Sequence, residues 1–329
     1  MRIAVDGLGG DHAPEQVVQG AARADVDAEI LLVGPLEELQ RHMPPRPRSR
    51  VTLVAAARGV EMDEPPARVL RHGADTSMSV AVDLVARREA DAVVSAGNSG
   101  ALVALARTRL ERIRGIDRPA IATPIPTPTG QCILLDAGAN VDCQPIHLAQ
   151  FGILGAMYCK HALGIDNPRV GLLNIGTEIT KGNGVTRAAH ELMQKSPVNF
   201  VGFVEGNHIF TGEVDVVVCD GFVGNALLKA GEGLSHLILS ELRRSIYASR
   251  LARIGLLLMY PALRGLRRRF DYSTYGGALL LGVRGICVVC HGRSNADAIA
   301  NAIAVAYRAA KGRFVEAVAE ACEQLAAVP

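Results

Sequence analysis

Six short apolar runs, each ending at a polar turn, constrain the fold of this 329-residue chain more than any other feature. The turns are built from Gly, Asn, Asp, Ser or His, and the runs begin at Arg2, Ala92, Cys132, Val170, Val214 and Ile286. We expect each run to be a buried parallel strand, most of them followed by a helix. In an open α/β sheet such strands end at one edge, where ligands bind. The six turns therefore predict a cleft rich in backbone N–H groups, which suits phosphate or a similar oxyanion.

The alternation of strand and helix patterns along the chain predicts its architecture. Strands are expected near residues 3–5, 29–33, 51–55, 92–95, 132–136, 170–175, 200–204 and 214–220. Helices are expected near residues 14–24, 77–88 and 145–163. This order predicts an α/β fold with a mainly parallel, doubly wound sheet and right-handed crossovers. We expect one α/β domain over residues 1–329, with a helical excursion at about 222–270.

Residues 118–130 break the apolar pattern with four prolines, Pro119, Pro124, Pro126 and Pro128. Proline cannot donate a hydrogen bond to a neighbouring strand, so this spacing predicts an edge strand or an extended connector rather than a central strand. Near the start of the helix at 77–88, Ser77 or Ser79 is expected to be the N-cap residue.

The excursion at about 222–270 is expected to form two helices. The second carries an apolar block at residues 254–260, interrupted by Pro261, and ends in four arginines: Arg264, Arg267, Arg268 and Arg269. The block is too short to span a bilayer. An apolar face beside arginines suits an anionic membrane surface or a dimer interface. A core helix with a solvated basic end is the alternative.

Composition narrows the class of protein. The net charge is only +2 and aromatic residues make up 4% of the chain, with no Trp, so neither a basic face nor base stacking indicates nucleic acid as a partner. Seven scattered cysteines indicate reduced, mostly buried thiols in a cytoplasmic protein rather than a disulfide framework. The sequence shows neither a signal peptide nor an apolar stretch of about 20 residues.

Lys181 is the most attractive single candidate for chemistry. It lies in the segment 176–183, GTEITKGN, directly after an apolar strand, and this segment also holds Thr177 and Asn183. A lysine on a Gly-flanked loop at a strand end can place a point charge on phosphate or on a developing oxyanion. The alternative is an ordinary exposed loop lysine.

Other candidates lie at the remaining turns. Asn225 opens the long helix after the strand at 214–220, where it can cap the helix or donate to a substrate carbonyl. Asn98, Ser99 and Gly100 suit an anion and are equally good helix caps. The turn after the first strand holds Gly9, Gly10, Asp11 and His12, of which the Asp–His pair is either an acid–base pair or structural.

Several familiar motifs are absent or misleading. The chain has no Walker-type loop and no Ser/His/Asp arrangement, and its first glycines have the wrong spacing for a dinucleotide fingerprint. The string Cys287-Val-Val-Cys290-His291 matches c-type haem attachment, but it lies in an apolar strand of a chain without export signals. A second cysteine pair for zinc is missing, so we expect neither metal nor cofactor.

Taken together, the segments VDGLGGDHAP, SAGNSGALVA, GIDRPA, DAGANVDC, GLLNIGTEITKGN, VDVVVCDGFVGN and FDYSTYGGALLLGV resemble the bacterial acyl-carrier-protein:phosphate acyltransferases. The resemblance covers nearly the whole chain. It implies a Rossmann-like three-layer α/β/α sandwich with a protruding helical hairpin, in a homodimer that contacts the membrane peripherally. It also implies transfer of a long-chain acyl group from acyl carrier protein to inorganic phosphate. The acyl phosphate would feed a membrane glycerol-3-phosphate acyltransferase for phosphatidic acid synthesis.

The resemblance also implies roles for individual residues. Lys181 and Asn225 match the family's catalytic positions, with Lys181 on the phosphate or oxyanion and Asn225 on the thioester carbonyl. The substrate-binding residues would be Gly9, Gly10, Asp11, His12, Asn98, Ser99, Gly100, Thr177 and Asn183. Carrier protein is acidic, so arginine-rich loops are candidate docking sites.

The chain departs from the family pattern at four positions and leaves two alternative functions open. Gly184 stands where Glu is usual, Gln144 where Lys is common, Leu279 where Pro is common, and Arg293 replaces a small residue. A nicotinamide-dependent decarboxylating dehydrogenase would need an Asp cluster for metal and an acidic residue for the adenine ribose, and we find neither. A non-enzymatic lipid-binding module at the membrane surface explains the apolar helix but not the six polar turns.

Overall fold

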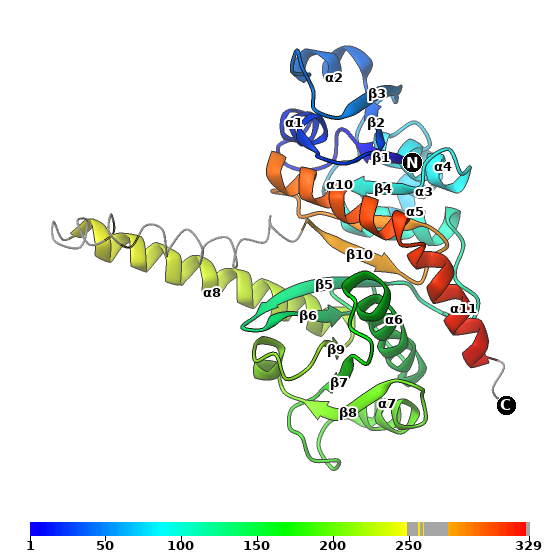
Figure 1. Cartoon of the computed structure of the whole chain (residues 1–329), viewed down its shortest axis with the longest axis vertical. Coiled ribbons are helices and arrows are strands. Elements are labelled where there is room, and N and C mark those ends of the chain that lie inside the picture. The colour runs from blue at the N-terminus through cyan, green and yellow to red at the C-terminus, as the bar shows by residue number, and fades with distance from the viewer. Residues whose placement is uncertain (249–255, 257–258, 260–275, 327–329) are drawn as a thin grey trace.

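The computed structural model describes residues 1–248, 256, 259 and 276–326, and its strands form one eleven-stranded sheet (Figure 1). The strands are β1 (Arg2–Asp6), β2 (Glu29–Gly34), β3 (Arg50–Ala55), β4 (Ala92–Ser95), β5 (Ala120–Thr127), β6 (Gly130–Leu135), β7 (Arg169–Leu173), β8 (Asn199–Val204), β9 (Val216–Val218), β10 (Ala278–Leu281) and β11 (Ile286–Val289). The helices are α1 (Glu15–Arg23), α2 (Leu36–His42), α3 (Pro66–His72), α4 (Ser77–Ala86), α5 (Ser99–Arg109), α6 (Pro145–Leu163), α7 (Gly184–Gln194), the 3₁₀ helix η1 (Gly206–Phe210), α8 (Gly221–Ala248), α10 (Ala296–Lys311) and α11 (Phe314–Ala326).

The sheet is mostly parallel, which confirms the predicted α/β class, but it reverses direction in the middle. The strand order is β3-β2-β1-β4-β11-β10-β5-β6-β9-β7-β8. The pairs β11·β10, β10·β5 and β5·β6 are antiparallel, and every other pair is parallel. Three reversals make β6, β9 and β7 run opposite to β1, β4 and β11. The expectation that all six turns share one edge of the sheet is therefore wrong: they form two sets of three.

Strand β5 corrects a second expectation, because it is central rather than an edge strand. It pairs with β6 over residues 122–127, whereas β10 pairs only with its first residues, 120–122. Pro124 and Pro126 lie beyond the end of β10, where β5 has a neighbour on one side only. The prolines therefore lie where a missing N–H leaves no ladder position unfilled.

Alternating side chains of the strands build a core on each face of the sheet. On β1, Ile3 and Val5 face a large cluster with α1, α6, α7, α10 and α11, whereas Ala4 faces a second cluster with α3, α4 and α5. On β6, Ile133 belongs to the first cluster and Leu134 to a third, which includes η1. Period-2 burial on both faces gives the three-layer sandwich that the family resemblance implies.

The cap of α4 and the cysteines show how the buried polar groups are arranged. Thr76, rather than Ser77 or Ser79, caps α4, because its Oγ1 accepts from the backbone N–H of Ser79 and Ser77 bonds elsewhere. The six cysteines whose side chains are described are free thiols, and five are buried. Burial raises the pKa of Cys287 and Cys290 to about 12, as expected of inert, buried thiols.

Helix α8 projects from the body of the molecule in Figure 1. Beyond Glu232 its described residues are largely exposed, including five large apolar side chains: Leu234, Leu237, Ile238, Leu239 and Leu242. The second predicted helix, its apolar block and its four arginines lie outside the described residues except for positions 256 and 259. In the part of the chain that the structure describes, no helix is long and apolar enough to cross a membrane.

Candidate active site

Asp6 joins the ends of β1 and β4, and sequence reasoning missed it. Its carboxylate is fully buried and accepts from the hydroxyl of Ser77 and, at 2.7 Å, from that of Ser95. Ser95 Oγ in turn accepts from the backbone N–H of Gly97 at 3.1 Å. Burial raises the pKa of Asp6, and the two hydroxyl hydrogen bonds oppose this shift. The carboxylate thus fixes the turns after β1 and β4 to the start of α4.

The turns after β1, β4 and β11 meet at the predicted Gly9–His12 segment. A Cβ at Gly9 would lie 2.6 Å from Asp6 Oδ2, and Gly10 has a φ of +105° with Gly292 O close by. The backbone N–H of Asp11 donates to Gly292 O at 2.8 Å. At Gly9 and Gly10 only glycine leaves enough room for the three turns to pack this closely. Asp11 and His12 are exposed at its rim.

Asn98 is fully engaged in structure, so the capping interpretation is the correct one for this residue. Its Oδ1 accepts from Ala101 N at 3.0 Å and caps α5. Its Nδ2 lies 3.3, 3.0 and 2.9 Å from the carbonyl oxygens of Glu61, Met62 and Glu64. Ser99 and Gly100 remain exposed in the first turn of α5, where backbone N–H groups face outward.

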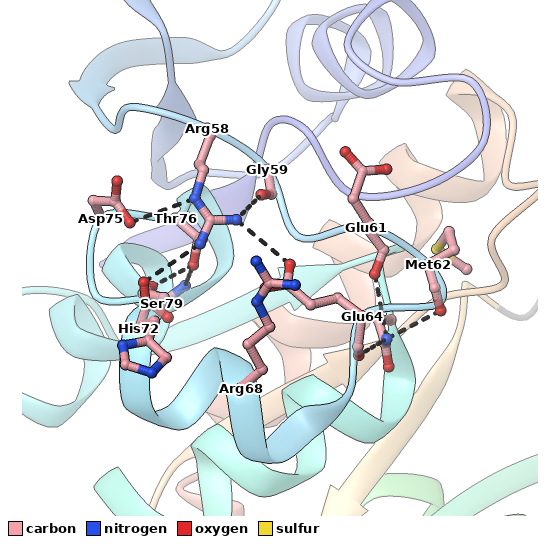
Figure 2. Close-up of polar contacts among 12 residues, drawn as sticks. Arg58, Gly59, Glu61, Met62, Glu64, Arg68, His72, Asp75, Thr76 and Ser79 are labelled. Atoms are coloured by element: carbon pink, nitrogen blue, oxygen red, sulfur yellow. Dashed lines mark hydrogen bonds and ion pairs between the residues drawn. The ribbon is translucent and has the colours of Figure 1, made fainter.

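Residues 58–64, the strap, cross the start of α5 and are fixed by charge pairs (Figure 2). The Glu64 carboxylate is 8% exposed and lies 3.4 Å from Arg58 and 3.7 Å from Arg68. Arg58 also approaches Asp75 at 3.7 Å and donates to the carbonyl oxygen of His72. Together with the three bonds from Asn98, these contacts hold the strap beside the predicted anion turn.

A second buried carboxylate, Asp136, organises the turn after β6. It accepts from five N–H donors at 2.7–3.2 Å: the backbones of Ile121, Gly138, Ala139 and Asn140 and the side-chain amide of Asn140. Burial raises the pKa of Asp136, and these hydrogen bonds oppose that shift. The donors satisfy a carboxylate that would otherwise be costly to bury.

The turn after β6 positions the start of α8 and therefore Asn225. Gly221 N donates to Asn140 O at 2.7 Å, and a Cβ at Gly224 would lie 1.9 Å from Asp136 O. Asp220 Oδ1 accepts from Val223 N at 2.8 Å and so takes the capping role. Asn225 is exposed beside Gly138, at which a Cβ would lie 3.9 Å from Asn225 Oδ1. The capping alternative for Asn225 is therefore wrong.

Lys181 lies in a much more open loop. Its side chain is exposed, and its ammonium group forms no hydrogen bond or ion pair with any residue that the structure describes. Ile175 is 82% and Ile179 is 70% exposed in the same loop, and Thr177 is exposed as well. Asn183 ends the loop as the N-cap of α7, with its Oδ1 accepting from Thr186 N at 2.9 Å. The side chain of Asn183 thus caps a helix, as the side chain of Asn98 does.

Two residues that sequence reasoning missed connect the two sets of turns. Lys229, one helical turn after Asn225 on the same face of α8, has its Nζ 3.3 Å from His291 Nε2 in the turn after β11. Lys229 also donates to Glu232 at 2.9 Å, and Glu232 lies 3.7 Å from His291. Burial, and then the charge of Lys229, lower the pKa of His291. The i, i+4 spacing from Asn225 was visible in the sequence, but the partner of Lys229 was not.

The site therefore has two parts. The first is the junction, where the start of α8 with Asn225 and Lys229 meets the turns after β6 and β11. The second part is the Lys181 loop, which no hydrogen bond or ion pair among the described residues joins to the other five turns.

The four departures from the family pattern lie outside these contacts of Asn225 and Lys181. Gly184 is the first residue of α7 and has open space around it, and Gln144 is the N-cap residue of α6. Leu279 is buried in β10, and Arg293 is exposed with its N–H donating to His291 Nδ1. Among the described residues there is no group of three His, Cys, Asp or Glu side chains that could hold a metal ion.

The sequence matches the model of a family described as "Fatty acid synthesis protein" over residues 1–317. The chain belongs to this family. It is 49% identical to the phosphate acyltransferase of Pelotomaculum thermopropionicum, covering 99% of this chain and 96% of that protein. It is 48% identical to the phosphate acyltransferase of Heliobacterium modesticaldum, with 97% of each chain covered. As a member of this family the protein is an acyltransferase, as the resemblance implied.

Solved structures that share the fold are much more distant in sequence. A phosphotransacetylase from Streptococcus pyogenes has a TM-score of 0.63 at 19% identity, covering 96% of this chain and 94% of that one. A 4-hydroxythreonine-4-phosphate dehydrogenase from Klebsiella pneumoniae has a TM-score of 0.55 at 12% identity, covering 94% and 99%. At these identities the comparison concerns the fold alone, and two reaction classes share it.

Proposed function

We propose that this acyltransferase moves a long-chain acyl group from the thioester of acyl carrier protein to inorganic phosphate. A phosphate oxygen attacks the thioester carbonyl carbon, the C–S bond breaks, and the carrier leaves as the thiol after taking up a proton. The products are acyl phosphate and free carrier protein. The observation that carries the proposal is 49% identity, over 99% of the chain, to a phosphate acyltransferase. That likeness favours acyl transfer over the dehydrogenase alternative, which has support only at the level of the fold.

The reaction needs no nucleophilic side chain, because phosphate is itself the nucleophile. Catalysis then depends on positioning the two substrates and on stabilising negative charge as it develops. We assign Asn225 to the thioester carbonyl, since its exposed amide is held rigidly where α8 meets the turn after β6. We assign Lys181 to phosphate or to the oxyanion, since its ammonium is exposed on a loop at a strand end.

The remaining predicted residues would orient the substrates. In the Gly9–His12 segment the N–H groups of Gly9 and Asp11 are bonded within the protein, so those of Gly10 and His12 would face phosphate or the pantetheine end. The exposed first turn of α5, with Ser99 and Gly100, would present further backbone N–H groups. Asn98 and Asn183 would act indirectly, by capping the helices that carry these turns. Thr177 would contribute from the Lys181 loop.

The product and the exposed part of α8 support a place at the membrane surface. Acyl phosphate with a long chain is amphiphilic, and a membrane glycerol-3-phosphate acyltransferase would use it to make phosphatidic acid. The five exposed apolar side chains of α8 between residues 234 and 242 suit peripheral contact with lipid or the interface of a homodimer. We therefore propose a cytoplasmic homodimer with peripheral membrane contact.

The test is to incubate the protein with acyl carrier protein thioester and phosphate and to measure acyl phosphate and free thiol. Phosphate-dependent formation of both supports the proposal; thiol release without phosphate, or no acyl phosphate, would reject it. Lys181→Ala is expected to lower kcat by about 10²–10³, as for loss of one oxyanion-stabilising group, with unchanged circular dichroism. Lys195→Ala, at the far end of α7, is the matched control. Activity of Lys181→Ala equal to that of the control would remove Lys181 from the mechanism.

A further inference from the structure

A proline- and arginine-rich loop, residues 43–49, is fixed against helix α1. Arg48 N donates to Ala22 O at 2.8 Å, and the hydroxyl of Ser49 donates to Ala24 O. Gln19 Nε2 donates to His42 O at 3.1 Å just before the loop. Prolines restrict the backbone further. The loop is therefore a preorganised platform rather than a loose surface segment, and its exposed residues are Pro45, Arg46, Pro47 and Arg48.

This loop forms one wall of a concavity of about 580 Å³, and α1 and α10 form the others. Three arginines line it, Arg23, Arg46 and Arg48, against a single carboxylate, Asp297. Arg23 lies 3.8 Å from Asp297, and both side chains are well exposed. Arg46 and Arg48 have no ion pair with any residue that the structure describes. The concavity thus carries an excess of two positive charges in a chain whose total is only +2.

The concavity lies close to the candidate active site. Helices α1 and α10 begin directly behind the turns after β1 and β11, and Gln16 Oε1 accepts from Ala296 N at 3.0 Å where they start. The lining residues of α10 lie within five positions of Ala296. At about 1.5 Å per residue, the concavity opens within roughly 8 Å of the turn that holds His291. Figure 1 shows α1 and α10 side by side on this face of the sheet.

We propose that this concavity is the docking surface for the acidic carrier protein that brings the acyl thioester. The inference rests on the proposed function, and it adds the surface on which the carrier protein would bind. Arginine guanidinium groups match carboxylates in bidentate pairs, and an unneutralised set steers an acidic partner toward the adjacent site. The open shape and the exposure of the arginines suit a protein surface, whereas a small anion would need donors that are buried around it.

The test compares two thioester donors. Arg46→Glu combined with Arg48→Glu is expected to lower kcat/KM for the acyl carrier protein thioester by about tenfold or more, because both charges become repulsive. With acyl-pantetheine, which has no protein part, kcat/KM should be unchanged. Replacing the acidic residues of one patch on the carrier by lysine should restore part of the kcat/KM that the double variant has lost. The matched control is Arg71→Glu combined with Arg107→Glu, which makes the same charge change on α3 and α5, on the opposite face of the sheet.

Direct binding separates this inference from the proposed reaction. Carrier protein without an acyl group is titrated into the wild type and both double variants. Only the Arg46/Arg48 variant should bind it about tenfold more weakly than the wild type does. Binding by the wild type should weaken as the salt concentration rises. Equal binding by all three proteins would overturn the docking surface even if acyl phosphate forms. Equal loss with both donors, or a changed oligomeric state of the Arg46/Arg48 variant, would overturn it as well. Failure of the wild type to make acyl phosphate from either donor would count against the proposed function alone.

Discussion

The two residues proposed for catalysis are held in opposite ways. Asn225 lies at the junction, where five hydrogen bonds to Asp136 and the close packing of Gly224 against Asp136 O leave the start of α8 no room to shift. Lys181 lies in a loop that, among the described residues, is anchored near its ends: Asn174 N donates to Val204 O, and Asn183 caps α7. The comparison suggests a division of labour: a fixed donor for the carbonyl, and an adaptable cation for the phosphate.

Energetics sharpen this contrast. The Asp136 carboxylate accepts from three buried and two part-buried N–H groups. It is expensive to disturb, because each buried donor left without an acceptor costs about 1–3 kcal/mol. A surface lysine without a partner contributes little to folding, so its position can be chosen for chemistry. Changes at the junction should therefore affect stability and activity together, whereas changes in the Lys181 loop should affect activity with only a small loss of stability.

The largest expected effect comes from Gly224→Ala. The new Cβ would lie 1.9 Å from Asp136 O, and because the obstacle is backbone, α8 or the turn after β6 must move. We expect a loss of about 3 kcal/mol or more in the free energy of unfolding, well above the ~1 kcal/mol that alanine gains in a helix. Acyl transfer should fall sharply because Asn225 is displaced. Urea unfolding and the transfer assay measure the two effects.

Gly184→Ala is the matched change in the other region. Nothing lies within 4 Å of a Cβ there, and the position begins α7. Its stability should stay within about 1 kcal/mol of the wild type, on the stabilising side. If Gly224→Ala were as stable and as active as Gly184→Ala, the rigid junction would not exist.

An intermediate effect is expected from Asn183→Ala. Losing the cap of α7 should cost about 1 kcal/mol, while Ala189 and Met193 keep the helix packed on the core. The freed loop should lower kcat more than the stability loss explains. Hydrogen exchange at the Thr186 amide should quicken, since that N–H loses its acceptor. Asn183→Ser keeps an acceptor and should behave like the wild type; an equal loss in both variants would contradict the capping explanation.

The sequence predicted the fold class because buried runs and turn residues act locally. The runs at 92–95 and 145–163 match β4 and α6 to the residue. The reversal of the sheet escaped prediction because it depends on β10, which follows the excursion and pairs with β5 far away in the chain. Four prolines in and beside β5 indicated an edge strand. The sequence does not indicate that one half of the strand has two neighbours and the other half only one.

Within the candidate site, residue types were predictable and their tasks were not. Asn98 suited either an anion or a cap, Asn183 was predicted only to bind substrate, and the structure shows both as caps. The opposite happened at Asn225, where Asp220 took the cap and left the amide exposed. Asp6 and Asp136 were missed because a buried carboxylate is recognised by its donors, which come from distant segments.

The prediction with the smallest expected effect concerns His291 and tests whether the junction extends to the turn after β11. Burial and then Lys229 lower the pKa of His291 from 6.5, whereas Glu232 and Asp11 oppose the shift and Arg293 adds to it. A histidine with a lowered folded pKa stabilises the fold above its unfolded pKa, and this contribution is lost as pH falls through the folded value. Lys229→Met should therefore raise the pKa of His291 without restoring 6.5, because burial remains.

Proton NMR titration of His291 in the wild type and in Lys229→Met measures that shift, and Lys195→Met serves as the control. Unfolding free energies at pH 7.5 and below pH 6.5 should differ less in Lys229→Met than in the wild type, since less of the fold's stability then depends on a neutral His291. An unchanged pKa would mean that the 3.3 Å contact does not persist in solution. Asn225 would then be positioned by the turn after β6 alone, and the fixed region would end at the first turn of α8.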